Sequence, residues 1–229
     1  YPSPIPILSH ISEVLNIFLS RLASHVPRRS TAVALVNPQQ IHSAVEQAFP
    51  GERRRRLWRL DSLGNTLYLL ILSADMPDLR SLTAQFGTGQ PPEVKDYAPL
   101  LNRILPGSTW QFRLTANPTK SCPGPAHPGR GIVHAHCSVE YQKQWLLDRA
   151  EKHGFRLEPD GFTVVDTHWL QFHKGASRQT VSIRSVTYEG ALTVTDAELF
   201  KKLLTEGIGR GKAYGLGLMT VIGRRPQNA

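Results

Sequence analysis

The sequence has few cysteines and no long apolar run. Cys122 and Cys137 are the only cysteines in the chain, so a disulfide scaffold is not expected and the reducing cytoplasm is the predicted location. No apolar run is long enough to cross a bilayer, so no membrane partner is expected. Residues 1–17 begin without Met, lack the basic start of a secretion signal and are rich in proline. We interpret them as an extension or a segment from another polypeptide.

Acidic residues are also scarce beside basic ones. The chain has 27 Lys and Arg against 18 Asp and Glu, which gives a net charge of +9. This excess of positive charge favours a polyanionic partner. The length of 229 residues suits one large domain or two small domains of about 100 residues each.

The most informative stretch is a glycine-rich segment at residues 207–217. Five glycines alternate there with Arg210, Lys212 and Tyr214. Glycine allows positive φ and close approach of a partner, and successive exposed N–H groups can form an anion-binding concavity. A helix is predicted at 196–206 before this loop and a buried strand at 216–222 after it. We therefore predict a helix, a basic glycine loop and a strand, with the loop facing an anion.

Nucleotide-binding loops do not explain this stretch. A P-loop ends in Gly-Lys-Ser/Thr with a glycine five residues before the second one, whereas Glu206 and Ala213 occupy those positions here. The dinucleotide-binding loop lies between a strand and a following helix, which is the reverse of the predicted order. A glycine-rich turn without function is the remaining structural alternative.

The first half of the chain predicts a strand–helix–strand–strand–helix unit. Asn37 suits a helix cap and Pro38 the first helical position, and apolar residues then share one face over 38–49. Strands at 57–60 and 66–73 form a hairpin, and a short helix follows at about 78–85. Residues 87–107 connect to the next unit and are expected to supply a closing strand. This order is ferredoxin-like or RRM-like.

The second half predicts the same order again. Thr109–Leu114 alternates as a strand does, and Ser138 is expected to cap a helix that ends at His153. Two strands, 177–187 and 191–194, are expected to form a hairpin around Gly190. The other strands are expected at about 155–158, 162–173 and 216–222. The predicted fold is α+β, with tandem ferredoxin-like (RRM-like) βαββαβ domains at 18–107 and 108–229.

Several segments resemble one family in the right order. Residues 206–218 resemble the C-terminal signature of the CasE-type CRISPR endoribonucleases, the RNA-processing subunits of type I-E Cascade. Matching segments also lie at 39–42, 112–120, 144–147 and 154–157, so the resemblance spans about residues 18–222. The family opens with a strand, which implies a strand over 18–26, although apolar residues between 11 and 22 also fall at helical spacing.

The resemblance implies a chemistry. The family cleaves CRISPR repeat RNA at the base of its hairpin, where a 2′-OH attacks the adjacent phosphate and leaves 2′,3′-cyclic phosphate and 5′-OH ends. His42 matches the catalytic histidine, and a histidine suits proton transfer near neutral pH as acid or base. Gln39 stands where the family usually has tyrosine, and it can hydrogen-bond but cannot titrate. Gln39, Ser43, Tyr214 and Lys212 are candidate helpers.

The same resemblance implies the partners. They are CRISPR repeat hairpin RNA, the other Cascade subunits, and target DNA through the assembled complex. Duplex RNA is recognised mainly through shape, phosphates and 2′-OH groups. The predicted RNA-binding residues are basic side chains and loop glycines, namely Arg53, Arg54, Arg55, Arg56, Arg113, Lys120, Arg130, Gly209, Arg210, Gly211 and Lys212.

A zinc site is a weaker interpretation of the predicted loop at 121–137. That loop contains Cys122, His127, His134, His136 and Cys137. Structural zinc sites usually bring ligands in spaced pairs such as C-x2-C, and none of these spacings repeats that geometry. We therefore expect no metal and no other cofactor.

Two other functions remain as alternatives. The first is a non-catalytic subunit that binds the guide-RNA hairpin within Cascade, which the glutamine at position 39 keeps open. The second is a general RRM-like nucleic-acid binder. That class carries an aromatic-rich pattern on its sheet, and no segment of this chain has that pattern.

Overall fold

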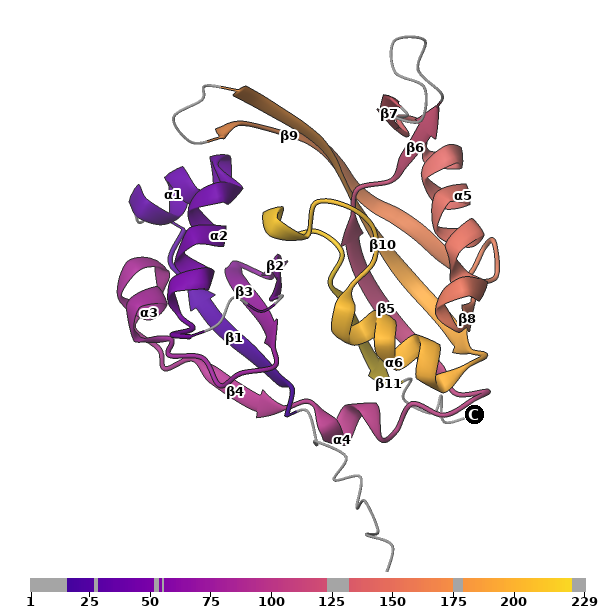
Figure 1. The fold of residues 1–229 in the computed structure, drawn as a ribbon, viewed down its shortest axis with the longest axis horizontal. Helices are drawn as coiled ribbons and strands as arrows, with labels where there is room; N and C mark the ends of the chain where they lie inside the picture. Colours follow the sequence, from indigo (N-terminus) through magenta and orange to yellow (C-terminus); the bar gives the residue numbers. More distant parts are fainter. Residues whose placement is uncertain are drawn as a thin grey trace, which may run out of the picture.

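The first unit is a four-stranded antiparallel sheet covered by helices on one face (Figure 1). The structure is a computed structural model, and it describes residues 16–26, 29–51, 54, 56–122, 132–174 and 179–223. The strand order is β2-β3-β1-β4, which is the ferredoxin-like order. The strands are β1 (Phe18–Ser24), β2 (Leu57–Leu63), β3 (Thr66–Ser73) and β4 (Glu93–Asp96).

Three helices complete this unit. Helix α2 (Pro38–Gln47) begins as predicted, since the Asn37 side chain accepts a hydrogen bond from the backbone N–H of Gln39. Helix α3 (Arg80–Phe86) is close to its predicted range. Helix α1 (Arg29–Val36) was not predicted from the sequence. Apolar side chains of α2 and α3, with β3 beneath them, form the core of the unit.

The second unit repeats the arrangement. Its sheet has the order β11-β5-β10-β8, and β9 also pairs with β10. A long ribbon made by β9 and β10 extends beyond the sheet toward α1, as Figure 1 shows. The strands are β5 (Thr109–Ala116), β8 (Phe155–Arg156), β9 (Phe162–Lys174), β10 (Gln179–Val194) and β11 (Met219–Gly223).

The helices of the second unit begin at polar caps. Ser138 caps α5 (Val139–Ala150), as predicted, and a short 3-10 turn η1 (Glu151–His153) continues it. Asp196 caps α6 (Ala197–Glu206). Both helices pack on the sheet over a core that also buries Ile104 from the connecting segment around α4 (Ala98–Leu101). The tandem ferredoxin-like fold is thereby confirmed, whereas the division at residue 107 stays a prediction.

Two predictions about the second unit are wrong. The predicted hairpin around Gly190 is one continuous strand, β10, and its partner in a hairpin is β9. Gly190 is needed for close packing, because a Cβ there would lie 2.4 Å from the carbonyl oxygen of Gly161. The predicted loop at 121–137 contains a hairpin of β6 (Thr119–Cys122) and β7 (Ile132–Ala135).

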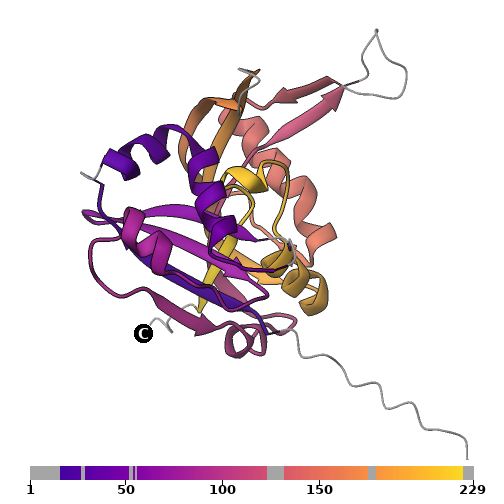
Figure 2. The ribbon, with the colours of Figure 1, turned by 60° about the vertical axis from the view of Figure 1, so that its left-hand side comes forward.

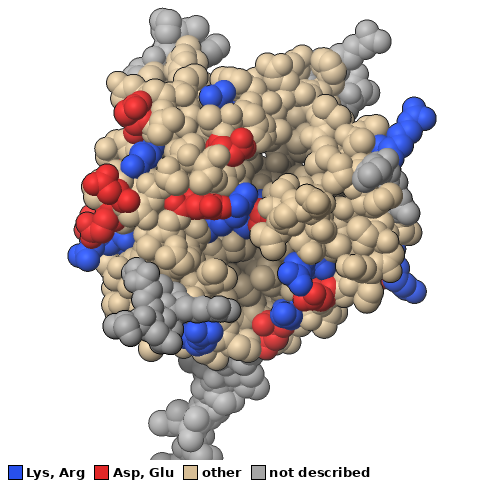
Figure 3. Space-filling view, turned by 180° about the vertical axis from the view of Figure 1, so that it is seen from behind, with Lys and Arg blue, Asp and Glu red and all other residues tan. Residues whose placement is uncertain are grey.

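A buried arginine joins the two units. Arg59 on β2 is 1% exposed and forms a bidentate ion pair with Asp61, with Nε–Oδ1 and Nη2–Oδ2 distances of 2.8 and 2.6 Å. Its Nη1 donates to the carbonyl oxygens of Arg113 and Leu218 in the second unit, at 2.9 and 2.7 Å. Figure 2 shows the units side by side, and Figure 3 shows basic and acidic side chains together in the hollow between them. This network links the two units.

No helix among the described residues is both long and apolar enough to cross a lipid bilayer.

Candidate functional site

Helix α2 presents three of the predicted catalytic residues on one side. Gln39, His42 and Ser43 are spaced three and four residues apart, so they are neighbours on the helix surface. Ser43 is exposed, His42 and Gln39 are half-buried, and the Ser43 hydroxyl donates to the carbonyl oxygen of Gln39 at 3.0 Å. The helix therefore holds an imidazole, an amide and a hydroxyl at the surface of the first unit.

The glycine loop runs between α6 and β11, as predicted. Its five glycines, at 207, 209, 211, 215 and 217, all have positive φ. The loop folds back on itself, since the N–H of Ile208 donates to the carbonyl oxygen of Gly217 at 2.9 Å. The N–H of Gly217 in turn donates to the carbonyl oxygen of Thr115 on β5 at 2.7 Å, which connects the loop to the sheet. Gly209 and Arg210 remain exposed at its outer edge.

The glycine loop also contacts the helix that carries His42. A 3-10 turn in the loop, η3 (Lys212–Tyr214), packs against α2 and β2 of the first unit (Figure 1). Packing is close enough that a Cβ on Gly215 would lie 2.5 Å from the Trp58 ring. The two strongest sequence motifs, more than 160 residues apart in the chain by residue number, are thus in contact and make one candidate site.

Tyr214 is held by packing within this site. Its ring lies 4.8 Å from that of Phe172 on β9, measured between ring centres, and Leu216 belongs to the same apolar cluster. Tyr214 also lines a pocket of about 340 Å³ between the units, together with the hydrogen-bonded pair His168 and Asp166. The structure therefore gives this tyrosine a structural role beside any role in catalysis.

Lys212, which belongs to η3, also acts electrostatically on the end of α5. Burial lowers the pKa of His153, which follows α5, and the nearby charges of Arg149 and Lys212 lower it further. The basic loop therefore spans the distance from the His42 helix to the end of α5. Gly211, directly before Lys212, has a φ of +84°, which favours glycine there.

The predicted arginine run divides into different environments. Arg54 is exposed and lies 3.5 Å from Asp75. Arg56 is buried, with its Nη1 3.1 Å from Glu46 and its guanidinium over the ring of Phe49. Arg53 and Arg55 lie outside the described residues, as does Arg130. A buried arginine that is paired with a carboxylate is poorly placed to bind RNA, so Arg56 serves the fold of the first unit.

Arg113 also forms ion pairs with acidic neighbours. Its Nε lies 3.3 Å from Asp61, and its Nη1 pairs with Glu189 across the sheet. Its charge is therefore largely balanced within the protein. Lys120, by contrast, is exposed on β6.

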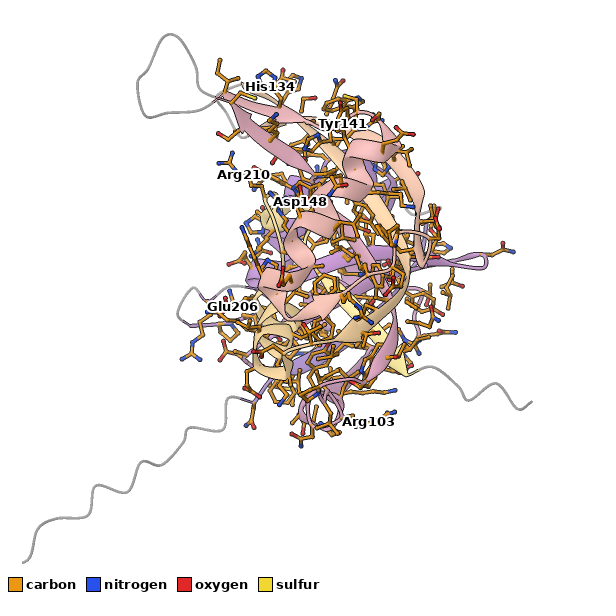
Figure 4. All side chains as sticks on the ribbon, turned by 90° about the vertical axis from the view of Figure 1, so that its right-hand side faces the viewer. Arg103, His134, Tyr141, Asp148, Glu206 and Arg210 are labelled. Atoms are coloured by element: carbon orange, nitrogen blue, oxygen red, sulfur yellow. The ribbon has the colours of Figure 1, made fainter. Side chains whose placement is uncertain are left out.

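Lys120 and Arg210 lie along one groove beside α5. Arg210 forms an isolated antiparallel β-bridge with Asn117, which precedes β6. Residues of β6 and of the glycine loop line two adjoining hollows together with residues of α5. Figure 4 shows Arg210 on the same part of the molecule as His134 and Tyr141, with Arg103 at the opposite end. Sequence reasoning did not assign Arg149 to this groove. The only signal was its position four residues after Trp145 on the helix.

The cysteines and histidines of the 121–137 segment do not cluster within the part of the chain that the structure describes. No group of three His, Cys, Asp or Glu side chains there could hold a metal ion. Cys137 donates weakly to the carbonyl oxygen of Ala135, and His136 stacks on Tyr141 with 5.9 Å between ring centres. His127 lies outside the described residues.

The chain is similar to known proteins over most of its length. Residues 17–222 match the family described as CRISPR associated protein. The chain is 29% identical to the CRISPR-associated endoribonuclease Cse3 of Thermus thermophilus, over 90% of this chain and 99% of that protein. The structure of Thermus thermophilus Cse3 bound to an RNA representing a pre-cleavage complex matches with a TM-score of 0.74 and 29% identity, over 90% of this chain and 99% of that chain.

A more distant structure shares the fold. Cas6e from Escherichia coli K-12 is 20% identical and matches with a TM-score of 0.56, over 91% of this chain and 100% of that chain. The resemblance of the motifs to CasE-type endoribonucleases is thus confirmed, and the chain belongs to the CRISPR-associated protein family.

Proposed function

We propose that this chain is an endoribonuclease that cleaves CRISPR repeat RNA at the base of its hairpin. The observation that carries the proposal is the contact between the His42 helix of the first unit and the basic glycine loop of the second. Helix α2 supplies the His42 imidazole, which can transfer protons. The glycine loop supplies the cations Arg210 and Lys212 and an exposed backbone at Gly209, which can bind phosphates. Similarity to an endoribonuclease that was solved with a pre-cleavage RNA supports the same conclusion.

The proposed reaction needs no metal ion. The 2′-OH attacks the adjacent phosphorus, the bond to the 5′ oxygen of the next nucleotide breaks, and a 2′,3′-cyclic phosphate forms. One proton leaves the 2′-OH and one reaches the departing oxygen, which becomes a 5′-OH. Because nucleophile and phosphate belong to the same nucleotide, the protein has to align them and move these protons. His42 is the proposed group for one of these two transfers.

The neighbours of His42 are proposed to assist by hydrogen bonding. Gln39 is one helical turn before His42 and can hold the 2′-OH or a phosphate oxygen, although it cannot exchange a proton at neutral pH. Ser43 is exposed beside it. Lys212 and Tyr214 approach from the glycine loop, where a lysine would stabilise negative charge on the phosphate.

After cleavage the chain is proposed to stay bound to the mature guide RNA within Cascade. This product retains the hairpin, so the phosphate contacts made before cleavage persist after it. The other subunits are then partners, and target DNA is reached through the assembled complex. A non-catalytic hairpin-binding role is the competing function, because Gln39 replaces a residue that can titrate.

Product chemistry tests this proposal. The protein is incubated with its own CRISPR repeat RNA in the presence of EDTA, and the ends of the products are identified by mass spectrometry. We expect cleavage at one site, with 2′,3′-cyclic phosphate and 5′-OH ends. Strict dependence on Mg²⁺ or Zn²⁺ would contradict the mechanism, and tight binding without cleavage would support the non-catalytic role.

A further inference from the structure

A groove beside the glycine loop has the composition of an anion site. It lies between β6, α5 and the loop, and its inner part is lined by Thr119, Ser121, Trp145, Arg149, Gly209 and Arg210. An adjoining hollow of about 400 Å³ adds Lys120, His136 and Tyr141. The side of the molecule that contains this groove is shown in Figure 4, where Arg210 and Tyr141 are labelled.

Positive charge dominates the groove. Arg149, Arg210 and Lys120 line it, and Asp148 is the only acidic residue among its described lining residues. The Asp148 carboxylate accepts a hydrogen bond from the Gln144 amide at 2.7 Å. Arg149 is partly withdrawn from water, and its burial lowers the pKa of the guanidinium. A partly desolvated cation with little compensating charge favours an anionic ligand.

Arg149 is also fixed in orientation. Its guanidinium lies 4.4 Å from the centre of the Trp145 ring, and its Nη1 donates to the carbonyl oxygen of Trp145 at 3.0 Å. Stacking on a ring holds the plane of the guanidinium, and with it the remaining N–H groups, in a fixed orientation. This preorganisation suits hydrogen bonding to the oxygens of a phosphate.

Trp145 contributes a donor that the protein leaves unused. Trp145 is 3% exposed, and its Nε1 has no hydrogen-bond partner among the described residues. Buried N–H groups are nearly always paired, so an orphan donor requires an explanation. The six-membered ring of the indole faces the glycine loop, because a Cβ on Gly209 would lie 3.2 Å from Cζ2 and 3.3 Å from Cη2. Trp145 also lines the inner part of the groove.

We propose that this groove binds one backbone phosphate of the substrate RNA, with Arg149 as the principal cation and the Trp145 Nε1–H as a neutral hydrogen-bond donor. Lys120 and Arg210 add charge, and Thr119 and Ser121 line the same space. The inference rests on the proposed function, since it assumes that the polyanion is RNA. Arg149 and Trp145 would position the RNA relative to His42 rather than take part in the chemistry.

A charged and a neutral contact differ in their salt dependence, which gives a sharp test. The probe is repeat hairpin RNA, and affinity is measured over a salt series in a His42→Ala background that prevents cleavage. Arg149→Met should weaken binding and reduce the log–log salt slope by about 0.7–0.9, because one phosphate loses its cation. Trp145→Phe should weaken binding by about tenfold with an unchanged slope, because the donor it removes carries no charge.

The chain offers a matched control for these variants. Arg103 stacks on the buried Trp110 with 5.4 Å to the ring centre, but the Nε1 of Trp110 already donates to the Ser108 hydroxyl at 2.9 Å. Figure 4 shows Arg103 at the end of the molecule away from the groove. Arg103→Met should therefore leave both the affinity and the salt slope unchanged. If Arg149→Met and Trp145→Phe match this control, the phosphate site is wrong.

A second measurement covers the case in which Trp145→Phe does not fold. Methylphosphonates that remove one RNA charge at a time are combined with Arg149→Met. We expect one position at which the RNA change and the protein change are not additive, whereas additivity at every position would overturn the inference. If the parent protein binds no repeat RNA, the proposed function itself fails. RNA binding that is unaffected by these variants refutes only the groove.

Discussion

At the scale of single residues, the structure distinguishes arginines that form buried ion pairs and hydrogen bonds within the protein from arginines that are exposed to solvent. Four consecutive arginines at 53–56 looked alike in the sequence, yet Arg54 is exposed and Arg56 is buried beside Glu46. Arg59, which carried no functional signal, proves to be a buried link between the units. Sequence patterns could not distinguish these roles, because the acidic partners and accepting carbonyls lie far away in the chain.

Arg59 makes a testable contribution to stability. Arg59→Met would leave the half-buried Asp61 with only its weaker contact to Arg113, and it would also remove one donor from each of the carbonyl oxygens of Arg113 and Leu218. Removal of one partner of a buried ion pair typically costs about 3–5 kcal/mol. Urea denaturation should show a loss of this size. Arg54→Met, which affects an exposed pair, should cost less than about 1 kcal/mol.

His136 gives a prediction about pH. Burial lowers its pKa, and the charges of Arg149 on α5 and Lys120 on β6 lower it further, while Asp148 acts in the opposite direction. Tyr141 stacks on the ring. NMR titration should therefore give a pKa below the ordinary value of about 6.5, and Arg149→Met should raise it.

The same shift fixes the sign of a stability change. The unfolded chain binds the His136 proton more readily than the native protein does. Stability contributed by this group is therefore full above pH of about 6.5 and falls as the pH drops from there through the lowered native pKa. A His136→Gln variant should lose less stability than the parent over this range, and an equal loss would contradict the assignment.

At the scale of elements, caps and periodicity predicted the helices that matter for the site. Asn37 before α2, Ser138 before α5 and Asp196 before α6 all cap as such residues usually do. Helix α1 was missed because Arg29–Val36 is short, contains β-branched residues and packs on α2 and α3. Gly190 was interpreted as a turn, although close approach of another strand explains it.

The glycine loop can be tested as an element. Replacing both Arg210 and Lys212 by Ala should weaken RNA binding and reduce the salt slope, since each lost phosphate contact removes roughly one unit or less. Gly211→Val should weaken binding with an unchanged slope, because it places a β-branched residue at a φ of +84° and a Cβ 2.8 Å from Leu216 Cδ1. The readout is hairpin affinity over a salt series.

The outcomes of that experiment separate two roles of the loop. If the double alanine variant keeps the slope of the parent protein, the loop is structural and the phosphate contacts lie elsewhere, with the exposed Arg54 and the groove residues Lys120 and Arg149 as candidates. If Gly211→Val binds normally, positive φ at this position is not needed for RNA recognition.

At the scale of the whole molecule, the two ferredoxin-like units bring motifs from both halves of the chain into contact. The sequence predicted the fold class and the two motifs, because glycine, histidine and helix caps leave local signals. It did not predict that η3 packs on α2, nor that Arg149 lines the groove with Lys120 and Arg210. Those contacts depend on how the units dock, which is set by long-range partners such as Arg59 and Leu218.

The central claim is that His42 acts in catalysis at a site whose RNA affinity comes mainly from other residues. Its most direct test is single-turnover cleavage of repeat hairpin RNA in EDTA, measured together with binding affinity, for the parent protein and for His42→Ala. His25→Ala is the control, because His25 is exposed after β1 and is not part of the proposed site. We predict that His42→Ala lowers the cleavage rate by about 10²–10⁴-fold with nearly unchanged affinity. A His42→Ala variant that cleaves at the rate of the parent protein would contradict the account.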